Sequence, residues 1–444
     1  MLKFTNTLLH GAFVSLICIS GFAATAQVKE QPISLQQAID SALTHNRNLK
    51  MSGLDRDIAL SKYRQTNAIY MPQLNFSMTG MATDNPLNVF GLKLGQGLVT
   101  QSDFDPARLN DPATRSDFMT RFSLQQPIYN PELFEQRKAA AAAAAASKWA
   151  GQRQEAFIRF ETQKAFLQLQ FTMDAENVMA DGLHTATALY KFTKDRAEQG
   201  LLQQSDALNA SVQVTGMETA LAESKSSVLN ASDYLGYLMG KTPGIRFQPT
   251  PATDQVNNNT INPVLNENRS DFKAMEQAIA ASDLMISASR KSYLPRLNAF
   301  GSMQWNDKAL AGFGAHSWLA GLNLSWDIFR GNSTRNKIST QTLETQKLRE
   351  QLNEQKDQSR LELEKTIRQL QDAKQRITRD EAALNSATEA LRILQNRYEQ
   401  GLVNSTDVLQ AQSQITRLGL EKAQAIFTLR TTLAYLNFLS ENNQ

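Results

Sequence analysis

Residues that could carry out acid–base or metal chemistry are few and widely separated in this chain of 444 residues. The histidines are His10, His45, His184 and His316, and the single cysteine is Cys18. No zinc-site spacing, phosphate-binding loop or nucleophile elbow joins any of them. We therefore predict no catalytic residues, no cofactor and no metal site, in a protein that is not an enzyme.

Two acidic turns are the most distinctive chemical feature. The stretches 196–208 and 397–409 each hold a glycine, a leucine directly after it and an aspartate six residues after the glycine. These residues are Gly200, Leu201 and Asp206 in the first copy and Gly401, Leu402 and Asp407 in the second, 201 positions later. Glycine accepts the left-handed conformation that ends a helix, and the aspartate, or the Ser205 or Thr406 before it, can cap the next one. Each copy predicts the turn of a helical hairpin, in which the aspartates could be caps alone.

The segments on both sides of these turns predict long helices. Residues 132–199 and 332–400 contain no proline. Apolar residues recur along them at alternating spacings of three and four, as in a coiled coil. The return arms carry the same pattern, for example at Ala207, Ala210 and Val214. A helix of about 69 residues is ~100 Å long, so each hairpin has one arm of unusual length.

Four shorter stretches alternate apolar and polar residues and predict β-strands, at about 73–82, 117–126, 296–306 and 317–327. Their candidate membrane-facing residues are Leu74, Phe76, Phe122, Trp305, Trp318, Leu322 and Trp326. Tilted strands of this length can cross a bilayer, and tryptophan is typical of membrane interfaces. Because alternation does not identify the solvent, a soluble β-sandwich in the periplasm stays an alternative.

The number of strands limits how they could lie in a membrane. A transmembrane barrel needs at least about eight strands, and an open sheet edge cannot lie in lipid. Four strands in a membrane would therefore require several copies of the chain to share one barrel.

The chain is predicted to consist of a leader and two repeats. Residues 1–26 have the positive start, apolar middle and Ala-Thr-Ala end of a signal peptide, and the large Ile17 before Cys18 argues against lipidation there. The first repeat is 27–240, with its hairpin turn at 200, and the second is 269–444, with its turn at 401. The proline-rich residues 241–268 are predicted to form a linker that separates the two repeats and does not join a core. A net charge of +3 gives no reason to expect a nucleic-acid partner.

The duplicated plan resembles the TolC-type outer-membrane channel family. Three features support this resemblance: the paired turns, the strand pair before each long helix, and a short motif that occurs in both repeats. The motif is Tyr70-Met-Pro72-Gln-Leu-Asn75 in the first repeat and Tyr293-Leu-Pro295-Arg-Leu-Asn298 in the second. The resemblance implies a mainly α fold with a small antiparallel β part, in which a homotrimer shares a 12-stranded transmembrane barrel above a long coiled-coil α-barrel. Residues 241–268 would lie in the equatorial belt.

The resemblance also implies a function. Such a protein is an outer-membrane channel-tunnel of a tripartite efflux or type I secretion system. It extends into the periplasm, contacts outer-membrane lipid, and works with a periplasmic adaptor (a membrane fusion protein) and an inner-membrane pump. The alternative is a periplasmic adaptor or a coiled-coil structural protein of the envelope, but an adaptor needs one hairpin rather than two.

Specific roles follow for the turns by resemblance. Gly200, Leu201, Gly401 and Leu402 match the tips that meet the adaptor. Asp407 matches an aspartate that rings the constriction, and the second ring position is Gln410. Tyr398 and Asp206 match a hydrogen-bonded pair that holds the gate closed. The arginine expected two residues after Gly401 is Val403 here, so one gate contact is missing.

Overall fold

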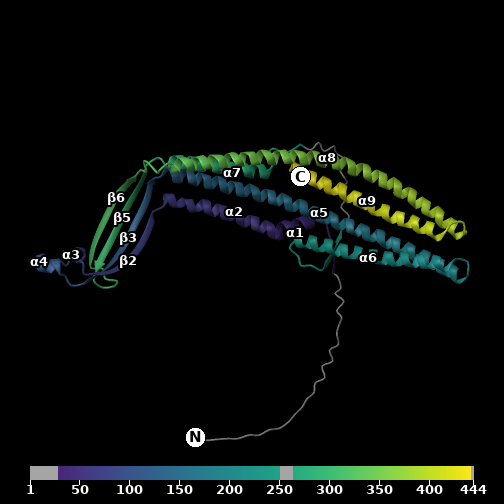
Figure 1. Cartoon of the computed structure of the whole chain (residues 1–444), viewed down its shortest axis with the longest axis horizontal. Helices are drawn as coiled ribbons and strands as arrows, with labels where there is room; N and C mark the ends of the chain where they lie inside the picture. Colours follow the sequence, from purple (N-terminus) through teal and green to yellow (C-terminus); the bar gives the residue numbers. More distant parts are fainter. Residues whose placement is uncertain (1–28, 251–263, 442–444) are drawn as a thin grey trace, which may run out of the picture.

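The computed structural model describes residues 29–250 and 264–441. The predicted signal peptide and residues 251–263 of the predicted linker lie outside this part. The described part is elongated, with a β-sheet at one end, two helix turns at the other and long helices side by side between them (Figure 1).

The longest helices are α5 (Pro131–Glu198) and α8 (Ser333–Glu399), and α6 (Gln204–Leu238) and α9 (Ser405–Ser440) return beside them. The Asn130 side chain caps α5 by accepting a hydrogen bond from the Leu133 N–H at 3.2 Å, with proline at the first helical position, where it is favoured. α5 has 68 residues and is ~100 Å long. Within the described residues, none of the helices is both long and apolar enough to cross a membrane.

Shorter helices complete the length of each hairpin. α1 (Leu35–His45) and α2 (Arg47–Gln65), continued by the 3-10 helix Thr66–Tyr70, pack against α5. α7 (Ser270–Lys291) packs against both α5 and α8. As a result, α2 and α6 lie end to end beside the long helices, and so do α7 and α9 (Figure 1).

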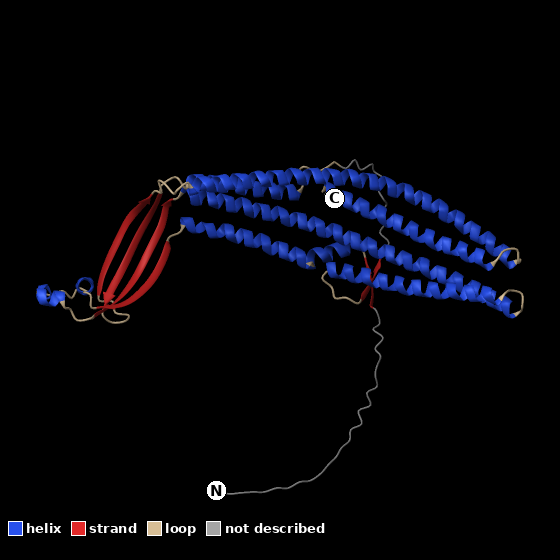
Figure 2. Cartoon of the chain, in the orientation of Figure 1, coloured by secondary structure: helices blue, strands red, loops and turns tan. Residues whose placement is uncertain are grey.

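One antiparallel sheet contains β2 (Gln73–Thr83), β3 (Arg115–Tyr129), β5 (Arg296–Asp307) and β6 (Ala315–Ser325), in the order β2-β3-β5-β6 (Figure 2). The register is regular except for one shift between Pro127 and Tyr129 of β3. Phe76 lies opposite Phe122, Phe122 opposite Met303, and Met303 opposite Trp318. Residues directly opposite each other project from the same face, so the apolar sets of all four strands share one face. β2 and β6 are the free edges.

Trp326 is one residue beyond the sheet, because β6 ends at Ser325 and not at about 327 as predicted. The Trp326 indole N–H donates to the Tyr293 carbonyl at 2.8 Å. This bond ties the residue to the turn before β5, so Trp326 belongs to the junction between strands and helices.

The connection between β2 and β3 is rich in glycine, proline, asparagine and aspartate, a composition that predicts a long exposed loop, but it contains short helices. It contains α3 (Pro86–Gly95), the 3-10 helix Gln101–Phe104 and α4 (Pro106–Asn110). The Asn85 and Asp105 side chains cap the two α-helices directly before a proline. Asx-Pro is a helix-start signal that the high glycine and proline content hid.

A small parallel sheet joins β1 (Lys29–Ile33) to β4 (Ile245–Pro249). Phe247 from β4 is 1% exposed and belongs to the largest buried apolar cluster, with residues of α1, α5 and α6. The prediction that 241–268 separates the halves without joining a core is therefore wrong for residues 245–249. A strand of five residues that contains one proline is too short for a period-two signal to stand out.

Candidate functional site

Both predicted turns end a long helix with the same backbone geometry. At Gly200 φ is +74°, the Gly200 N–H donates to the Ala197 carbonyl at 3.0 Å, and the Leu201 N–H donates to the Arg196 carbonyl at 2.9 Å. The turn at Gly401 repeats this, with φ +74° and both bonds at 2.9 Å. This is the Schellman arrangement. Apart from the adjoining chain, no heavy atom of the described residues lies within 4 Å of the point where a side chain would start at either glycine, so the positive φ, and not lack of space, favours glycine.

Each turn presents one leucine to solvent and turns the next residue inward. Leu201 is 65% exposed and Leu402 is 64% exposed. The residues that follow them, Leu202 and Val403, pack against a buried cluster that includes Tyr398. The far end of the molecule therefore carries two equivalent exposed leucines on a packed base.

The two aspartates have different contacts. Asp407 is exposed and lies at the third position of α9, where its carboxylate accepts a hydrogen bond from the Asn404 N–H at 3.3 Å. Asn404 is the N-cap of α9, so Asp407 supports the cap rather than forming it. Asp206 is half-buried and accepts a hydrogen bond from the Ser405 hydroxyl at 3.3 Å. α6 has Gln203 at its N-cap and no side-chain cap, so the alternative that Ser205 or Asp206 caps this helix is wrong.

The predicted hydrogen bond between Tyr398 and Asp206 is absent from the described chain. The Tyr398 hydroxyl lies 3.2 Å from the Thr193 hydroxyl instead. Tyr398 is 4% exposed, and its ring packs on Phe192 of α5 with 5.4 Å between ring centroids. This packing directs the hydroxyl toward α5 and away from the start of α6.

Arg196 makes a contact that sequence reasoning missed. Its guanidinium donates to the Glu399 carbonyl at 3.1 Å and lies 4.5 Å from the Phe192 ring centroid. Together with the Thr193–Tyr398 and Asp206–Ser405 bonds, it gives three polar contacts between the first hairpin and the second near the turns. A signal was present in the sequence, since both copies of the turn motif begin with arginine. Gln410 is exposed one helical turn beyond Asp407 and therefore on the same side of α9.

At the opposite end of the molecule, the apolar face of the sheet is bare. Leu74 is 71% exposed, Trp318 is 78% exposed and Leu322 is 69% exposed. Phe76 and Phe122 are less open because their rings pack together, 5.1 Å between centroids. The more enclosed Trp305 contacts Phe122 and also Phe313, which follows β5. The other face is mostly polar, with residues such as Asn75, Ser123, Ser302 and Asn323.

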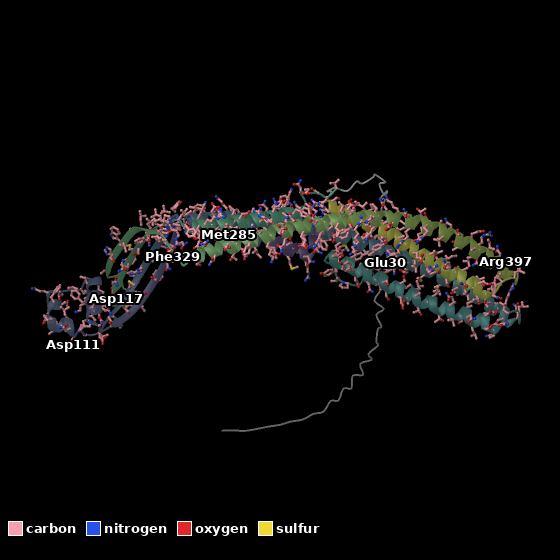
Figure 3. All side chains as sticks on the ribbon, turned by 45° about the horizontal axis from the view of Figure 1, so that its top comes forward. Glu30, Asp111, Asp117, Met285, Phe329 and Arg397 are labelled. Carbon is pink, nitrogen blue, oxygen red and sulfur yellow. The ribbon has the colours of Figure 1, made fainter. Side chains whose placement is uncertain are left out.

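A buried polar cluster ties the insert between β2 and β3 to the polar face of the sheet. The Gln96 amide donates to one oxygen of Asp117 at 2.8 Å, and the Asn306 amide donates to the other at 2.7 Å. Arg115 donates to Gln96 at 2.6 and 3.0 Å. Asp117 is 1% exposed, at the end of the strands away from the helices (Figure 3). A lone glutamine inside a glycine-rich stretch carries no recognisable sequence signal.

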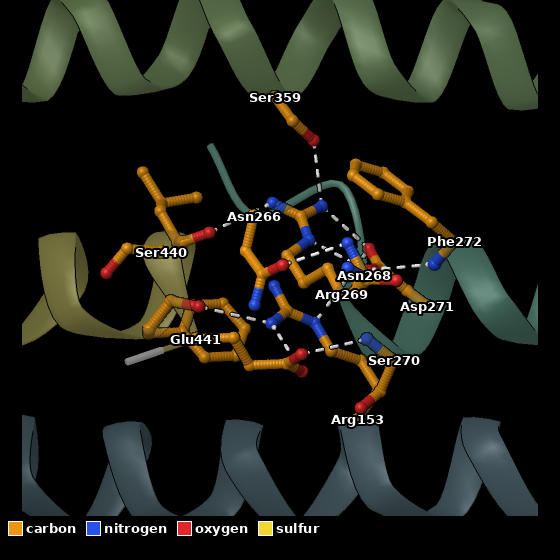
Figure 4. A network of polar contacts seen from close by, with 12 residues as sticks. Arg153, Asn266, Asn268, Arg269, Ser270, Asp271, Phe272, Ser359, Ser440 and Glu441 are labelled. Carbon is orange, nitrogen blue, oxygen red and sulfur yellow. Dashed lines mark hydrogen bonds and ion pairs between the residues drawn. The ribbon is translucent and has the colours of Figure 1, made fainter. Parts of the chain in front are cut away.

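A network of charged residues, in which Arg269 is buried and Arg153, Asp271 and Glu441 are half-buried, lies where α9 ends beside the start of α7 (Figure 4). The Arg269 guanidinium donates to both oxygens of Asp271 at 2.7 Å and to the Ser359 hydroxyl at 2.8 Å. Arg153 of α5 lies 3.6 Å from Glu441 and 3.9 Å from Asp271. Burial alone would raise the pKa of Asp271, but the hydrogen bonds and charge of Arg269 hold that pKa below its usual value. Burial lowers the pKa of Arg153.

One hydrogen bond recurs in both repeats at the same spacing as the turns. The Tyr234 hydroxyl donates to Glu161 at 2.8 Å, and the Tyr435 hydroxyl donates to Glu362 at 2.8 Å. Both residues of the second pair lie 201 positions after those of the first. Burial raises the pKa of each tyrosine to about 12, and the carboxylate beside it acts in the same direction. The repeat therefore extends from the turns to the middle of the helices.

Known proteins resemble this chain over most of its length. Outer membrane protein OprJ of Pseudomonas aeruginosa is 26% identical over 404 residues, which covers 85% of this chain and 78% of OprJ. The cation efflux system protein CusC of Escherichia coli is 22% identical over 430 residues, covering 91% of this chain and 83% of CusC.

Solved structures share the fold. The outer membrane protein VceC of Vibrio cholerae has a TM-score of 0.75 at 18% identity and covers 91% of this chain and 95% of its own. A structure of CusC has a TM-score of 0.76 at 17% identity, with 91% of each chain covered.

The family model described as outer membrane efflux protein matches residues 38–241 and 263–439, nearly all of both repeats. This match favours neither an enzyme nor a periplasmic adaptor. The chain belongs to the outer membrane efflux protein family, as a passive efflux channel of the outer membrane that extends into the periplasm.

Proposed function

We propose that three copies of this chain form one conduit from the periplasm to the exterior. Each copy would contribute four strands to a 12-stranded barrel in the outer membrane and two hairpins to a helical tunnel. The repeats at 27–240 and 269–444 would supply equivalent halves of the tunnel wall, and 241–268 would lie at its equator.

The observation that carries this proposal is the bare apolar face of an open sheet. A soluble sandwich would cover residues such as Trp318 and Leu322 with a second sheet, yet they are 78% and 69% exposed. The free edges of β2 and β6 need partners to lie in lipid. Neighbouring copies can supply them, because edge β6 of one copy can pair with edge β2 of the next.

Two adjacent residues of β6 test this arrangement. Leu322→Arg places a charge on the proposed lipid side and should cost about 2–4 kcal/mol in membrane insertion. Asn323→Arg places the same charge on the proposed lumen side and should insert normally. The readout is the yield of heat-modifiable trimer in outer-membrane fractions. Equal yields for the two variants would contradict the assignment of faces, and monomers in the membrane would contradict the shared barrel.

We further propose that the two turns meet a periplasmic adaptor, which links the conduit to an inner-membrane pump for efflux or type I secretion. The support is the pair of exposed leucines on a packed base, since one apolar side chain at each turn suits contact with the end of another hairpin. Leu201→Asp with Leu402→Asp should abolish export while trimers still form. Gln203→Asp, which adds one negative charge to the first turn and keeps both leucines, should export normally. Normal export by the leucine variants would reject the docking role.

The same end of the molecule is proposed to be the gate. Three copies of the exposed Asp407, with Gln410 one turn away, would line a constriction that attracts cations. The Thr193–Tyr398, Arg196–Glu399 and Asp206–Ser405 contacts would hold the hairpins of each copy together in the closed state. Each such bond contributes about 1 kcal/mol, so the binding of a partner would open the gate if its binding free energy exceeds that of a few of these bonds.

A further inference from the structure

We propose that the junction between the strands and the helices binds anionic phospholipid of the leaflet that faces the periplasm. This surface, termed the basic collar, consists of residues 62–72, 130–138, 290–296 and 326–337. The inference rests on the proposed position of the strands in the membrane, and it adds the leaflet and the charge of the lipid.

The collar concentrates positive charge at one end of the sheet. Its four segments hold ten lysines and arginines against three aspartates and glutamates, a net charge of +7. The connections at the other end of the strands, 84–114 and 307–314, hold three basic and five acidic residues. Because the whole chain has a net charge of only +3, this asymmetry is a local property of the collar.

The carboxylates inside the collar do not neutralise it. Glu135 is 4% exposed and binds both Lys138, at 2.9 Å, and Lys291, at 2.7 Å. The hydrogen bond from Lys291, followed by that from Lys138, lowers the pKa of Glu135, so it is ionised and already shared. Asp327 is likewise shared between Arg296 and Arg330. Each of these two carboxylates pairs with two cations, so each group of three residues keeps a net positive charge.

Five further cations of the collar are exposed, and none forms an ion pair within residues 29–250 and 264–441. They are Lys62, Arg64, Arg290, Arg335 and Lys337. The first three lie in the last turns of α2 and α7, where the helix dipole favours positive charge. Arg335 and Lys337 lie at the start of α8, where the dipole disfavours it. Their position is therefore not explained by the helix itself, and an anion outside the chain would compensate for it.

An apolar loop lies beside these cations. Ile328 is 78% exposed and Phe329 is 77% exposed in the connection from β6 to α8. Figure 3 places Phe329 where the strands meet the helices. Head groups occupy only about 5–8 Å on each side of the hydrocarbon core, and long cationic side chains can reach into that layer from the helix ends. Apolar tips next to exposed cations match the two parts of an anionic phospholipid, the acyl chain and the charged head group.

Native mass spectrometry of the full protein in detergent tests this inference. Phosphatidylglycerol and phosphatidylcholine with the same acyl chains are added at equal concentration, and bound lipids are counted. We expect phosphatidylglycerol to be preferred at least fivefold at low salt, with the preference falling as ionic strength rises. The triple variant Arg290→Gln, Arg335→Gln, Lys337→Gln should reduce this preference at least fivefold, toward equal binding of the two lipids, because each cation near an anionic surface contributes about fivefold.

A matched triple variant provides the control. Lys347→Gln, Lys365→Gln and Lys374→Gln remove the same charge from exposed positions farther along α8, and the lipid preference should be unchanged. Equal binding of both lipids by the wild type, or an equal loss in the two triple variants, would overturn the proposal. The same spectra report the trimer mass: a trimer without lipid preference contradicts only the collar, whereas lipid preference without a trimer supports the collar and contradicts the proposed assembly.

Discussion

The two halves of the chain follow one plan but hold it together with different chemistry. Where α6 ends beside α1 and α2, the contact is apolar and includes Phe247, Leu235 and Val228, each at most 1% exposed. Where α9 ends beside α7, only a small apolar cluster of Leu363, Leu436 and Leu439 is present, and a polar network around Arg269 and Asp271 lies next to it. The repeat has kept helix lengths and turn positions, while the chemistry of the junctions has diverged. Geometry is therefore the property that the proposed tunnel requires of both halves.

The turns show a similar difference. Arg196 and Asp206 of the first copy bond to the second hairpin. Their counterparts, Arg397 and Asp407, are exposed and form no ion pair among the described residues. The first turn therefore joins the two hairpins of the same chain. We expect the second copy to face the neighbouring subunit or the pore.

The largest expected effect comes from the apolar junction. Phe247→Ala removes a buried ring from the main cluster and should lower the free energy of unfolding by about 3–5 kcal/mol. Phe247→Leu keeps most of the volume and should cost much less. Chemical denaturation followed by circular dichroism measures both. Similar stability for the alanine variant and the wild type would show that the first junction does not depend on apolar packing.

The charged junction should respond slightly less. Arg269→Gln leaves the half-buried Asp271 without its main partner and should cost about 3 kcal/mol in the same measurement. Arg360→Gln provides the control, because Arg360 is in exposed ion pairs on α8 and such pairs contribute little. If both arginine variants unfold alike, the network in Figure 4 does not stabilise the second half.

The two junctions should differ in their stability toward acid. The pKa of Asp271 is lowered in the folded chain, so its contribution to stability is complete above its ordinary pKa of 3.8 and is lost as the pH falls below that value. Hydrogen exchange, corrected for intrinsic rates, should show the end of α9 losing protection in acid before the end of α6 does. Simultaneous loss at both helix ends would contradict the assigned role of Asp271.

The recurring tyrosine contacts should give the smallest and most equal effects. Tyr234→Phe and Tyr435→Phe each remove one hydrogen bond to a carboxylate and should each cost about 1 kcal/mol. Thermal unfolding of the two variants measures this. A large difference between the stability losses of the two variants would show that the two repeats share the geometry of this contact but not its contribution to stability.

Much of the fold could be predicted because its elements are long and periodic. Strict heptad spacing and the Gly-Leu turns specify the hairpins, and alternation over ten residues specifies the apolar face that Leu322 and Trp318 share. What failed depends on single side chains in three dimensions. Phe247 joins the core from a strand of five residues, the Tyr398 hydroxyl faces Thr193 rather than Asp206, and Arg269 meets partners about 90 and 170 positions away. No local pattern encodes such contacts.

In the proposed channel, contacts between the two hairpins of each chain hold the closed end. Single-channel recording in planar bilayers tests this most directly. We expect wild-type trimers to be mostly closed and cation-selective. Arg196→Ala with Tyr398→Phe should raise the open fraction at least fivefold, since each lost bond contributes about 1 kcal/mol, and Asp407→Asn should weaken cation selectivity and block by multivalent cations. Absence of any conductance would contradict the proposed channel, and currents that none of these substitutions changes would contradict the proposed gate.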